Sequence, residues 1–360
     1  MSDGGDDDPP PPPPTTSDQA RDAAAHYDRV DVHRVALERR RELSTYAVRQ
    51  LHNWIKRQQI AMHVARGDLV LDVAAGKGGD LGKLAAAGAA GVVLVDVSAE
   101  SLREAQRRAP QAAPQLASTM RCVAGDAFSA EFWRNGAVDR QLVAVAGGGG
   151  RFRVQRKRGH ANRLRFAAVS CQFALHYGFS TRERVLALLH AVHWRLRVGG
   201  VFFGITADGF AVEHLLRERR HFSNALFSLD ARDSPTEPSD AIGASYRFTM
   251  ADASVVDVRE YVVHERTLRS LAEAAGFELV YYRRLPVFHA SLLVQWHRRP
   301  PSSNARGRAR APVNWHSSEH DPDSHRLSSL YAAFALRRLP DTDDRTKRAR
   351  SEPTDPVVPS

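Results

Sequence analysis

A short apolar run at residues 69–71 leads directly into a glycine-rich turn, and a helical pattern over residues 81–87 follows it. The segment reads Leu71-Asp72-Val73-Ala74-Ala75-Gly76-Lys77-Gly78-Gly79-Asp80-Leu81. Small residues between a strand and a helix let a ligand approach the backbone closely. The chain is therefore expected to contain an α/β unit with a ligand-binding turn at the end of a buried strand.

The same alternation of strands and helices is repeated further along the chain. Helices are expected at 99–108, with Ser98 as N-cap, and from Ser180, which has capping-box spacing to Glu183. Further strands are expected at 92–95, 121–124, 166–171, 201–205, 246–250 and 277–282, with a last edge strand at 330–336. Strands that alternate with helices predict a mostly parallel sheet with helices on both faces.

The segments around this core differ from it in composition. Residues 1–20 are rich in proline and aspartate and are expected to be a disordered tail, whereas residues 27–60 have a helical pattern. One domain is expected over 26–339, with probable flexible inserts at 134–163 and 298–327. Residues 340–360 form a basic tail, in which Lys347-Arg348-Ala349-Arg350 is a candidate nuclear-import signal.

Composition argues against several classes of protein. No apolar run reaches the roughly 18 residues of a membrane span, and the acidic, proline-rich start predicts no signal peptide. Two cysteines predict a reducing compartment and no cysteine-based zinc site. A net charge of +10 indicates an acidic partner, with nucleic acid as the first candidate.

Three classes of cofactor compete for the turn at 71–81. A P-loop does not fit, because Leu71 and Gly78 stand where it needs a glycine and a hydroxyl. A dinucleotide turn fits Gly76 and Gly78 but places Leu81 where a small residue is needed. S-adenosylmethionine has no phosphate and tolerates this turn. Asp96 and Asp126, at the next two strand ends, are placed to meet its ribose hydroxyls and its adenine edge, which favours a methyltransferase over a dehydrogenase.

Several motifs together resemble the eukaryotic mRNA cap guanine-N7 methyltransferases. They are the turn Gly76-Lys77-Gly78-Gly79-Asp80-Leu81, His52-Asn53-Trp54-Ile55-Lys56, Ser170-Cys171-Gln172-Phe173-Ala174-Leu175-His176-Tyr177, Arg197-Val198-Gly199-Gly200 and Val256-Asp257-Val258-Arg259-Glu260-Tyr261. The resemblance covers about residues 26–289 and the strand near Tyr331. It implies the class I S-adenosylmethionine-dependent methyltransferase fold, a Rossmann-like mostly parallel sheet. It also implies methyl transfer to N7 of the 5′ GpppN cap guanine of RNA, in the nucleus.

The resemblance also implies site residues, position by position. Cofactor contacts fall on Lys56, Ala74, Asp96, Asp126, Gln172 and Tyr177. Cap contacts fall on His52, Asn53, Lys77, Lys83, Arg108, His176, Glu260 and Tyr331. The chain has only five lysines, and three of them stand at these positions. It departs from the family where His52 replaces a common asparagine and Ala74 a frequent glycine, and where the segment after Leu285 lacks the usual acidic, aromatic ending.

The chemistry of these side chains agrees with the implied roles. Lys56 can pair with the methionyl carboxylate, Glu260 can accept from N1 and N2 of guanine, and Lys77, Lys83 and Arg108 can bind the triphosphate. Guanine N7 carries a free lone pair at neutral pH, so we expect catalysis by proximity and electrostatics, with no general base, nucleophile or metal.

Two other functions stay open at this point. One is a methyltransferase for another RNA or a small molecule, which has no use for the three cap-binding residues Lys77, Lys83 and Glu260 together. The other is a non-catalytic RNA-binding subunit. The guanylyltransferase motif Lys-x-Asp-Gly is absent from the sequence. Expected partners are therefore capped RNA and the RNA guanylyltransferase/triphosphatase or RNA polymerase II machinery.

Overall fold

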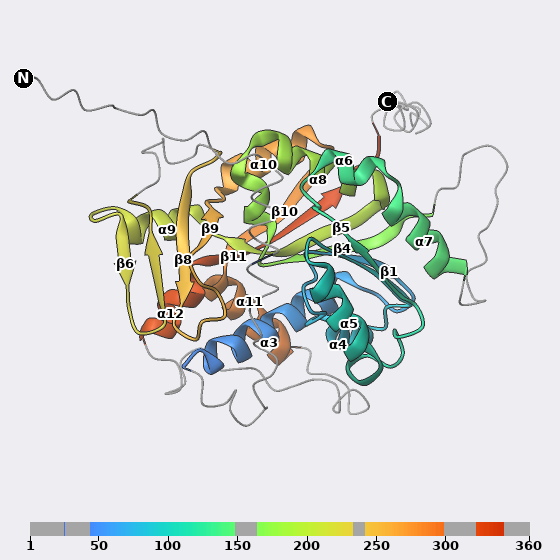
Figure 1. The fold of residues 1–360 in the computed structure, drawn as a ribbon, viewed down its shortest axis with the longest axis horizontal. Helices are drawn as coiled ribbons and strands as arrows, with labels where there is room; N and C mark the ends of the chain where they lie inside the picture. The colour runs from blue at the N-terminus through green and yellow to red at the C-terminus, as the bar shows by residue number, and fades with distance from the viewer. Residues whose placement is uncertain (1–24, 26–43, 148–163, 233–241, 299–321, 342–360) are drawn as a thin grey trace, which may run out of the picture.

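The structure, a computed structural model, describes residue 25 and residues 44–147, 164–232, 242–298 and 322–341. In these ranges a large twisted sheet crosses the molecule with helices on both sides, and a smaller sheet stands at one end (Figure 1). The expected tail at 1–20 and the import signal at 347–350 lie outside the described residues.

The large sheet has seven strands in the order β10-β11-β5-β4-β1-β2-β3. Its strands are β1 (Leu69–Val73), β2 (Gly91–Asp96), β3 (Met120–Ala124), β4 (Phe166–Gln172), β5 (Leu196–Ala207), β10 (Phe277–Arg284) and β11 (Tyr331–Arg338). The five strands β5-β4-β1-β2-β3 are parallel to their neighbours in the sheet. β11 is antiparallel to both β5 and β10. This mostly parallel sheet confirms the expected fold class.

Helices cover both faces because each strand buries alternate side chains on opposite sides. Val70 and Val92 pack with α3 (Tyr46–His63), α4 (Leu81–Ala87) and α5 (Ala99–Ala112). Leu71 and Val93 pack on the other face with α7 (Ala137–Gly147), α8 (Arg182–Arg195) and α10 (Glu265–Ala274). Every residue of β1 and β2 is buried, as expected for central parallel strands.

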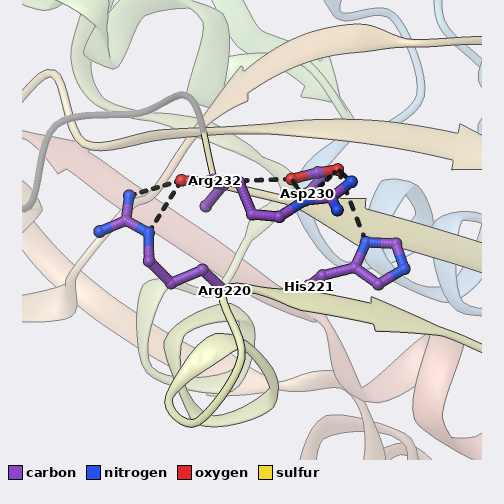
Figure 2. Close-up of polar contacts among 5 residues, drawn as sticks. Arg220, His221, Asp230 and Arg232 are labelled. Carbon is purple, nitrogen blue, oxygen red and sulfur yellow. Dashed lines mark hydrogen bonds and ion pairs between the residues drawn. The ribbon is translucent and has the colours of Figure 1, made fainter.

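The smaller sheet is antiparallel, lies between β5 and β10 in the sequence, and has the order β6-β7-β8-β9. Its strands are β6 (His221–Ser223), β7 (Phe227–Asp230), β8 (Ser245–Met250) and β9 (Val258–Tyr261). At its outer edge Asp230 pairs with Arg232 and faces His221 at 3.6 Å, while Arg220 donates to the carbonyl of Ala231 (Figure 2). These contacts tie the open end of the β6–β7 hairpin, at the edge of the small sheet opposite to β9.

The remaining helices are α6 (Ala130–Arg134), the 3-10 helix η1 (Leu175–Ser180), α9 (Gly209–Leu216), α11 (Leu285–Arg298) and α12 (Pro322–Ser329). The last two pack with α3 beneath the small sheet, around buried Leu292 and Leu327. No helix in the described ranges is both long and apolar enough to cross a membrane.

Four expectations from the sequence were wrong. The strand expected at the edge, β11, lies inside the sheet, where its apolar residues are buried by both neighbours. Helix α8 is capped by Thr181, whose hydroxyl accepts from the amide of Arg184, because Ser180 belongs to η1. The insert expected at 134–163 begins with α7, which buries Val138 and Leu142 against the sheet. The insert expected at 298–327 ends in α12; residues 148–163 and 299–321 are not described.

Candidate functional site

The residues expected to hold the cofactor gather where the parallel strands end. Asp96 ends β2, Gln172 ends β4, and Ala74 follows β1 directly. The register pairs Val73 with both Val95 and Cys171, so these three ends are neighbours along one edge of the sheet. This is the edge at which open α/β sheets bind ligands.

Asp96 fixes the glycine-rich turn. Its Oδ2 accepts from the amide of Gly76 at 2.7 Å, and its Oδ1 accepts from the amide of Ser98 at 2.9 Å. The turn itself has Gly76 at φ +52° and Gly78 at φ +69°, in the left-handed region that favours glycine. Ala74 occupies the same region at φ +54°, at a strain cost that glycine would not have.

Asp126 is bound by an arginine that the sequence interpretation did not single out. Arg184 of α8 places Nη1 at 2.9 Å from Oδ2 of Asp126 and Nη2 at 3.4 Å from Oδ1. The Phe128 amide also donates to Oδ1, at 2.9 Å. Arg184 is buried, and its Nε has no hydrogen-bond partner among the described residues. The expected adenine-binding carboxylate is therefore oriented before any ligand arrives.

Beneath the turn lies a buried charge cluster of Asp72, Asp80, Lys56 and Lys83. The Asp80 carboxylate accepts from Lys56 Nζ at 3.0 Å and from Lys83 Nζ at 2.6 Å. Lys83 also donates to the carbonyl of Gly79 at 3.0 Å. The Lys83 ammonium is thus held inside the fold, and a phosphate would have to compete with Asp80 for it.

Burial sets the charges of this cluster. It is the main cause that raises the pKa of Asp72 to about 7, with the Asp80 charge adding to the shift and a hydrogen bond from Ser170 opposing it. Burial opposes ionisation of Asp80 too, but Lys56 and Lys83 outweigh it and hold the pKa of Asp80 well below its usual range. Burial lowers the pKa of Lys83 to about 8, against the attraction of Asp80.

Gln172 presents an unpaired acceptor to this edge. Its Nε2 donates to Oε1 of Gln59 at 3.2 Å, whereas its buried Oε1 has no partner among the described residues. Gln59 is itself fixed by donating to the carbonyl of Gly204 at 2.9 Å. An unsatisfied buried acceptor costs about 1–3 kcal/mol, so a ligand donor that meets this oxygen would be bound well.

An aromatic wall of His52, Phe173 and Tyr331 lies next to Lys56. Ring centroids are 5.0 Å apart for His52 and Phe173, 4.9 Å for Phe173 and Tyr331, and 5.8 Å for His52 and Tyr331. Lys56 Nζ lies 6.0 Å from the Phe173 ring centroid. Residues from α3, the end of β4 and the start of β11 therefore join the cofactor edge to a second surface.

Glu260 carries the charge of this second surface. It lies buried on β9, where its Oε2 accepts from the Tyr246 hydroxyl at 2.7 Å and its Oε1 lies 3.6 Å from Nε2 of His176. The amide of Ala207 donates to Nδ1 of the buried His176 at 3.5 Å, and Ala207 is in register with Tyr331. The small sheet thus places a carboxylate next to His176, whose ring is held by the backbone beside Tyr331.

The remaining expected residues lie around these two groups. Tyr177 is on η1, with its ring 4.4 Å from that of His176. Arg108, on α5, donates to the carbonyl of Lys77 at 2.9 Å, which places both cations at the glycine-rich turn. Asn53 is exposed on α3.

The structure brings the expected residues together, and it adds five that the sequence interpretation gave no role. These are Gln59, Asp80, Phe173, Arg184 and Tyr246. Asp80 and Phe173 stand inside the quoted motifs, so their position was a signal. Arg184 and Tyr246 act through partners 58 and 14 residues away, and no local pattern marks such pairs.

The chemistry of the strand ends fits S-adenosylmethionine. Carboxylates at Asp96 and Asp126 are acceptors for a nucleoside, the Lys56 ammonium suits a ligand carboxylate, and the Gln172 oxygen lacks a donor. No phosphate-binding cradle is needed for this ligand.

Comparisons with known proteins agree with this geometry. A family model described as the mRNA (guanine-N(7))-methyltransferase domain matches residues 14–339. The chain is 29% identical over 307 residues to the mRNA cap guanine-N(7) methyltransferase of Candida glabrata. The aligned region covers 81% of this chain and 67% of that protein. It is 28% identical over 328 residues to that of Saccharomyces cerevisiae, with 87% and 69% covered. It is 29% identical over 332 residues to mRNA cap guanine-N(7) methyltransferase 1 of Oryza sativa subsp. japonica, with 89% and 81% covered.

Proposed function

This chain belongs to the mRNA (guanine-N(7))-methyltransferase family, and we propose that it transfers the methyl group where the cofactor edge meets the aromatic wall. The enzyme is S-adenosylmethionine-dependent, and its substrate is capped RNA. The observation that carries the proposal is the buried Glu260 carboxylate, which lies 3.6 Å from His176 beside the nucleoside-binding edge. The amide of Ala207, the register partner of Tyr331 in the aromatic wall, donates to the same His176 ring. A base between these two surfaces meets stacking partners and an acceptor for its Watson–Crick edge.

The residues of the cofactor edge hold the methyl donor. Asp96 accepts from the two ribose hydroxyls, Asp126 accepts from the adenine amino group, and Lys56 binds the carboxylate of the methionyl part. When bound, S-adenosylmethionine supplies a methyl group on a sulfonium. Gln172 offers its free oxygen to a donor of the ligand, which removes the unsatisfied acceptor.

The residues of the second surface orient the cap guanine. Glu260 accepts from N1 and N2, a pair of donors that only guanine presents among the RNA bases. His52, Phe173 and Tyr331 bound the base, and His176, Asn53 and Glu260 position it. Lys77 and Arg108, at the turn, bind the triphosphate, and Lys83 contributes charge from below.

No proton transfer is required of the protein. Guanine N7 has a free lone pair at neutral pH, so the residues act by alignment of the reacting atoms. A positive charge develops on the guanine as N7 is methylated, and the fixed negative charge of Glu260 stabilises it. The His176–Glu260 pair serves recognition and charge stabilisation in this scheme, with no role as a base.

The test is methyl transfer from labelled S-adenosylmethionine to three RNAs of equal sequence that begin GpppN, pppN and ApppN. We expect labelled N7-methylguanine on the first RNA alone. Equal transfer to all three RNAs would favour a methyltransferase with another RNA target. Binding of GpppN-RNA without transfer would favour a non-catalytic RNA-binding subunit.

We further propose that the enzyme works in the nucleus beside the RNA guanylyltransferase/triphosphatase or the RNA polymerase II machinery. The support is its substrate class, since an mRNA cap is made on nascent transcripts. Imaging of a fluorescent fusion, with and without Lys347→Ala and Arg348→Ala, tests this location. Exclusion of the unmodified fusion from the nucleus would contradict it.

A further inference from the structure

A groove lies away from the residues assigned above, where β10 ends and α9 and α10 begin. It encloses about 630 Å³ and is lined by Phe210, His264, Arg266, Arg283, Arg284 and Val287, among others. A second hollow shares Phe210 and Arg284 with it and extends to His214, Arg326 and Leu330. We call these two adjoining hollows together the Phe210 groove.

The Phe210 groove carries unpaired positive charge. Arg266, Arg283 and Arg284 are exposed, and none of the three makes an ion pair with a carboxylate in the described ranges. Two acids also line the groove, and one of them, Asp208, interacts electrostatically with Arg284. Asp208 caps α9 by accepting from the amide of Ala211 at 2.8 Å, and Glu265 accepts from Arg269 at 2.7 Å. A polyanion in the groove would therefore meet Arg266 and Arg283 without a competing ion pair, and Arg284 in competition with Asp208.

An exposed aromatic platform accompanies this charge. The Phe210 side chain is 58% exposed although it is large and apolar. The rings of His214 and Phe210 are nearly parallel, at 10° with centroids 6.4 Å apart, and the Arg284 guanidinium lies 5.9 Å from the Phe210 ring centroid. Positive charge that tracks a backbone, combined with flat side chains on which bases stack, is how proteins bind single-stranded nucleic acid.

One short segment separates the Phe210 groove from the aromatic wall. Ser329 and Leu330 line the groove, whereas the next residue, Tyr331, is part of the wall. On the other side of the segment, the Ser328 hydroxyl lies 3.1 Å from Nε2 of His52 in the same wall. A chain whose 5′ end is held at the wall therefore has the groove as its neighbouring surface.

We propose that the Phe210 groove binds the single-stranded body of the capped RNA, downstream of the first nucleotides. The inference rests on the proposed function, because it takes the 5′ end of the RNA to lie at the aromatic wall. Phosphates of the chain meet Arg266, Arg283 and Arg284, and a base stacks on Phe210. The groove gives the enzyme a preference for longer capped RNA over the bare cap, without sequence specificity.

The test compares two substrates, the dinucleotide GpppG and a capped single-stranded RNA of 20 nucleotides, in the full chain. For the double variant R283A/R284A we expect the KM for the 20-mer to rise at least tenfold, with kcat and the KM for GpppG unchanged within twofold. The slope of the logarithm of the 20-mer binding constant against the logarithm of the salt concentration should become shallower by about 1.4. Each phosphate contact with a single strand contributes about 0.7 to this slope, and the variant loses two such contacts.

Phe210→Ala separates stacking from charge. We expect it to raise the KM for the 20-mer about fivefold or more while the salt dependence stays as in the wild type. The matched control is R134A/R140A, which removes two exposed arginines from α6 and α7, away from the groove. This control should leave both KM values unchanged.

Three results would overturn the proposal. The first is an unchanged KM for the 20-mer in R283A/R284A. The second is an equal rise in the control variant or for GpppG, which would assign the effect to overall charge or to the cap site. The third is that R283A/R284A loses the binding of a poly-glutamate peptide that the wild type binds, while its kinetics with the 20-mer stay as in the wild type. That result would make the groove a protein-docking surface. Failure of the wild type to methylate GpppG would instead contradict the proposed function itself.

Discussion

The buried guanidinium of Arg184 holds the carboxylate of Asp126 from one side, with Nη1 2.9 Å from Oδ2. Arg184 comes from α8, and Asp126 follows β3, so the contact joins two elements that no strand pairing connects. The carboxylate is thereby fixed at the edge where we place the adenine. We therefore propose that Arg184 acts as a positioning residue for the cofactor.

Arg184→Met should weaken the binding of S-adenosylhomocysteine about tenfold or more, because the freed Asp126 carboxylate loses its orientation. Arg184→Lys keeps the charge without the planar fork and should give an intermediate affinity. Titration calorimetry measures both. Arg195→Met is the control, since Arg195 is a buried arginine of the same helix that pairs with Asp139 at 2.6 Å. A similar loss of affinity in the control would show that α8 merely needs its arginines to fold.

Glu260→Gln should lose most activity on guanosine caps and much of the preference for guanosine over inosine caps. Inosine keeps the N1 donor but lacks the N2 amino group, so it leaves part of the buried Glu260 carboxylate unpaired. Tyr246→Phe removes only the hydroxyl that donates to Glu260 and should cause a smaller loss in the same direction. Initial rates on the two capped RNAs give the ratio. An unchanged ratio in a folded Glu260→Gln protein removes this residue from the cap site.

Ala74→Gly should stabilise the protein by about 0.5–1 kcal/mol. Ala74 has φ +54°, where an L-residue costs about 1–2 kcal/mol, and the gain is reduced by the greater entropy of glycine in the unfolded chain. Ala86→Gly, inside α4, should cost up to about 1 kcal/mol instead. Denaturant melts of the three proteins check the two signs. Destabilisation by both substitutions would show that the methyl group of Ala74 has a packing role.

Asp72→Asn should stabilise the protein more at pH 8 than at pH 5. Burial raises the pKa of Asp72 to about 7 in the folded protein, above its unfolded value of about 4. Between these values the folded state binds a proton that the unfolded chain has released, so the free energy of unfolding falls as the pH rises. Asparagine removes this loss, which amounts to at most about 4 kcal/mol. Denaturation at both pH values measures it, and an equal difference at pH 5 and pH 8 would refute the assignment.

Local patterns were sufficient to predict the parallel part of the sheet. Residues 69–71 and 92–95 are apolar runs with turns at both ends, and such runs mark strands buried on both faces. Residues 330–336 were expected to form an edge strand, whereas β11 lies inside the sheet with its apolar side chains buried. Which strands pair is decided by tertiary contacts, and the order of strands in a sequence does not show them.

The residues of the site also differ in whether local sequence patterns could predict them. Asp96 was predictable because a strand end fixes its place at the sheet edge. Glu260 entered only through the family resemblance, since β9, the strand that carries it, has four residues without a regular alternation of buried and partly exposed side chains. The ion pairs Lys56–Asp80 and Arg184–Asp126 join residues far apart in the sequence, and composition and spacing give no signal for them.

The interior position of β11 has a consequence for how the chain is made. β5 and β10 are both synthesised before β11, yet each pairs with β11 and not with the other. On the ribosome, these two strands wait with unpaired backbone edges until residue 338 has left the exit tunnel. The cofactor edge between β1, β2 and β4 does not depend on that event, whereas Tyr331 of the aromatic wall does. Completion of the proposed cap site therefore depends on the synthesis of β11, whereas the cofactor edge can form before it.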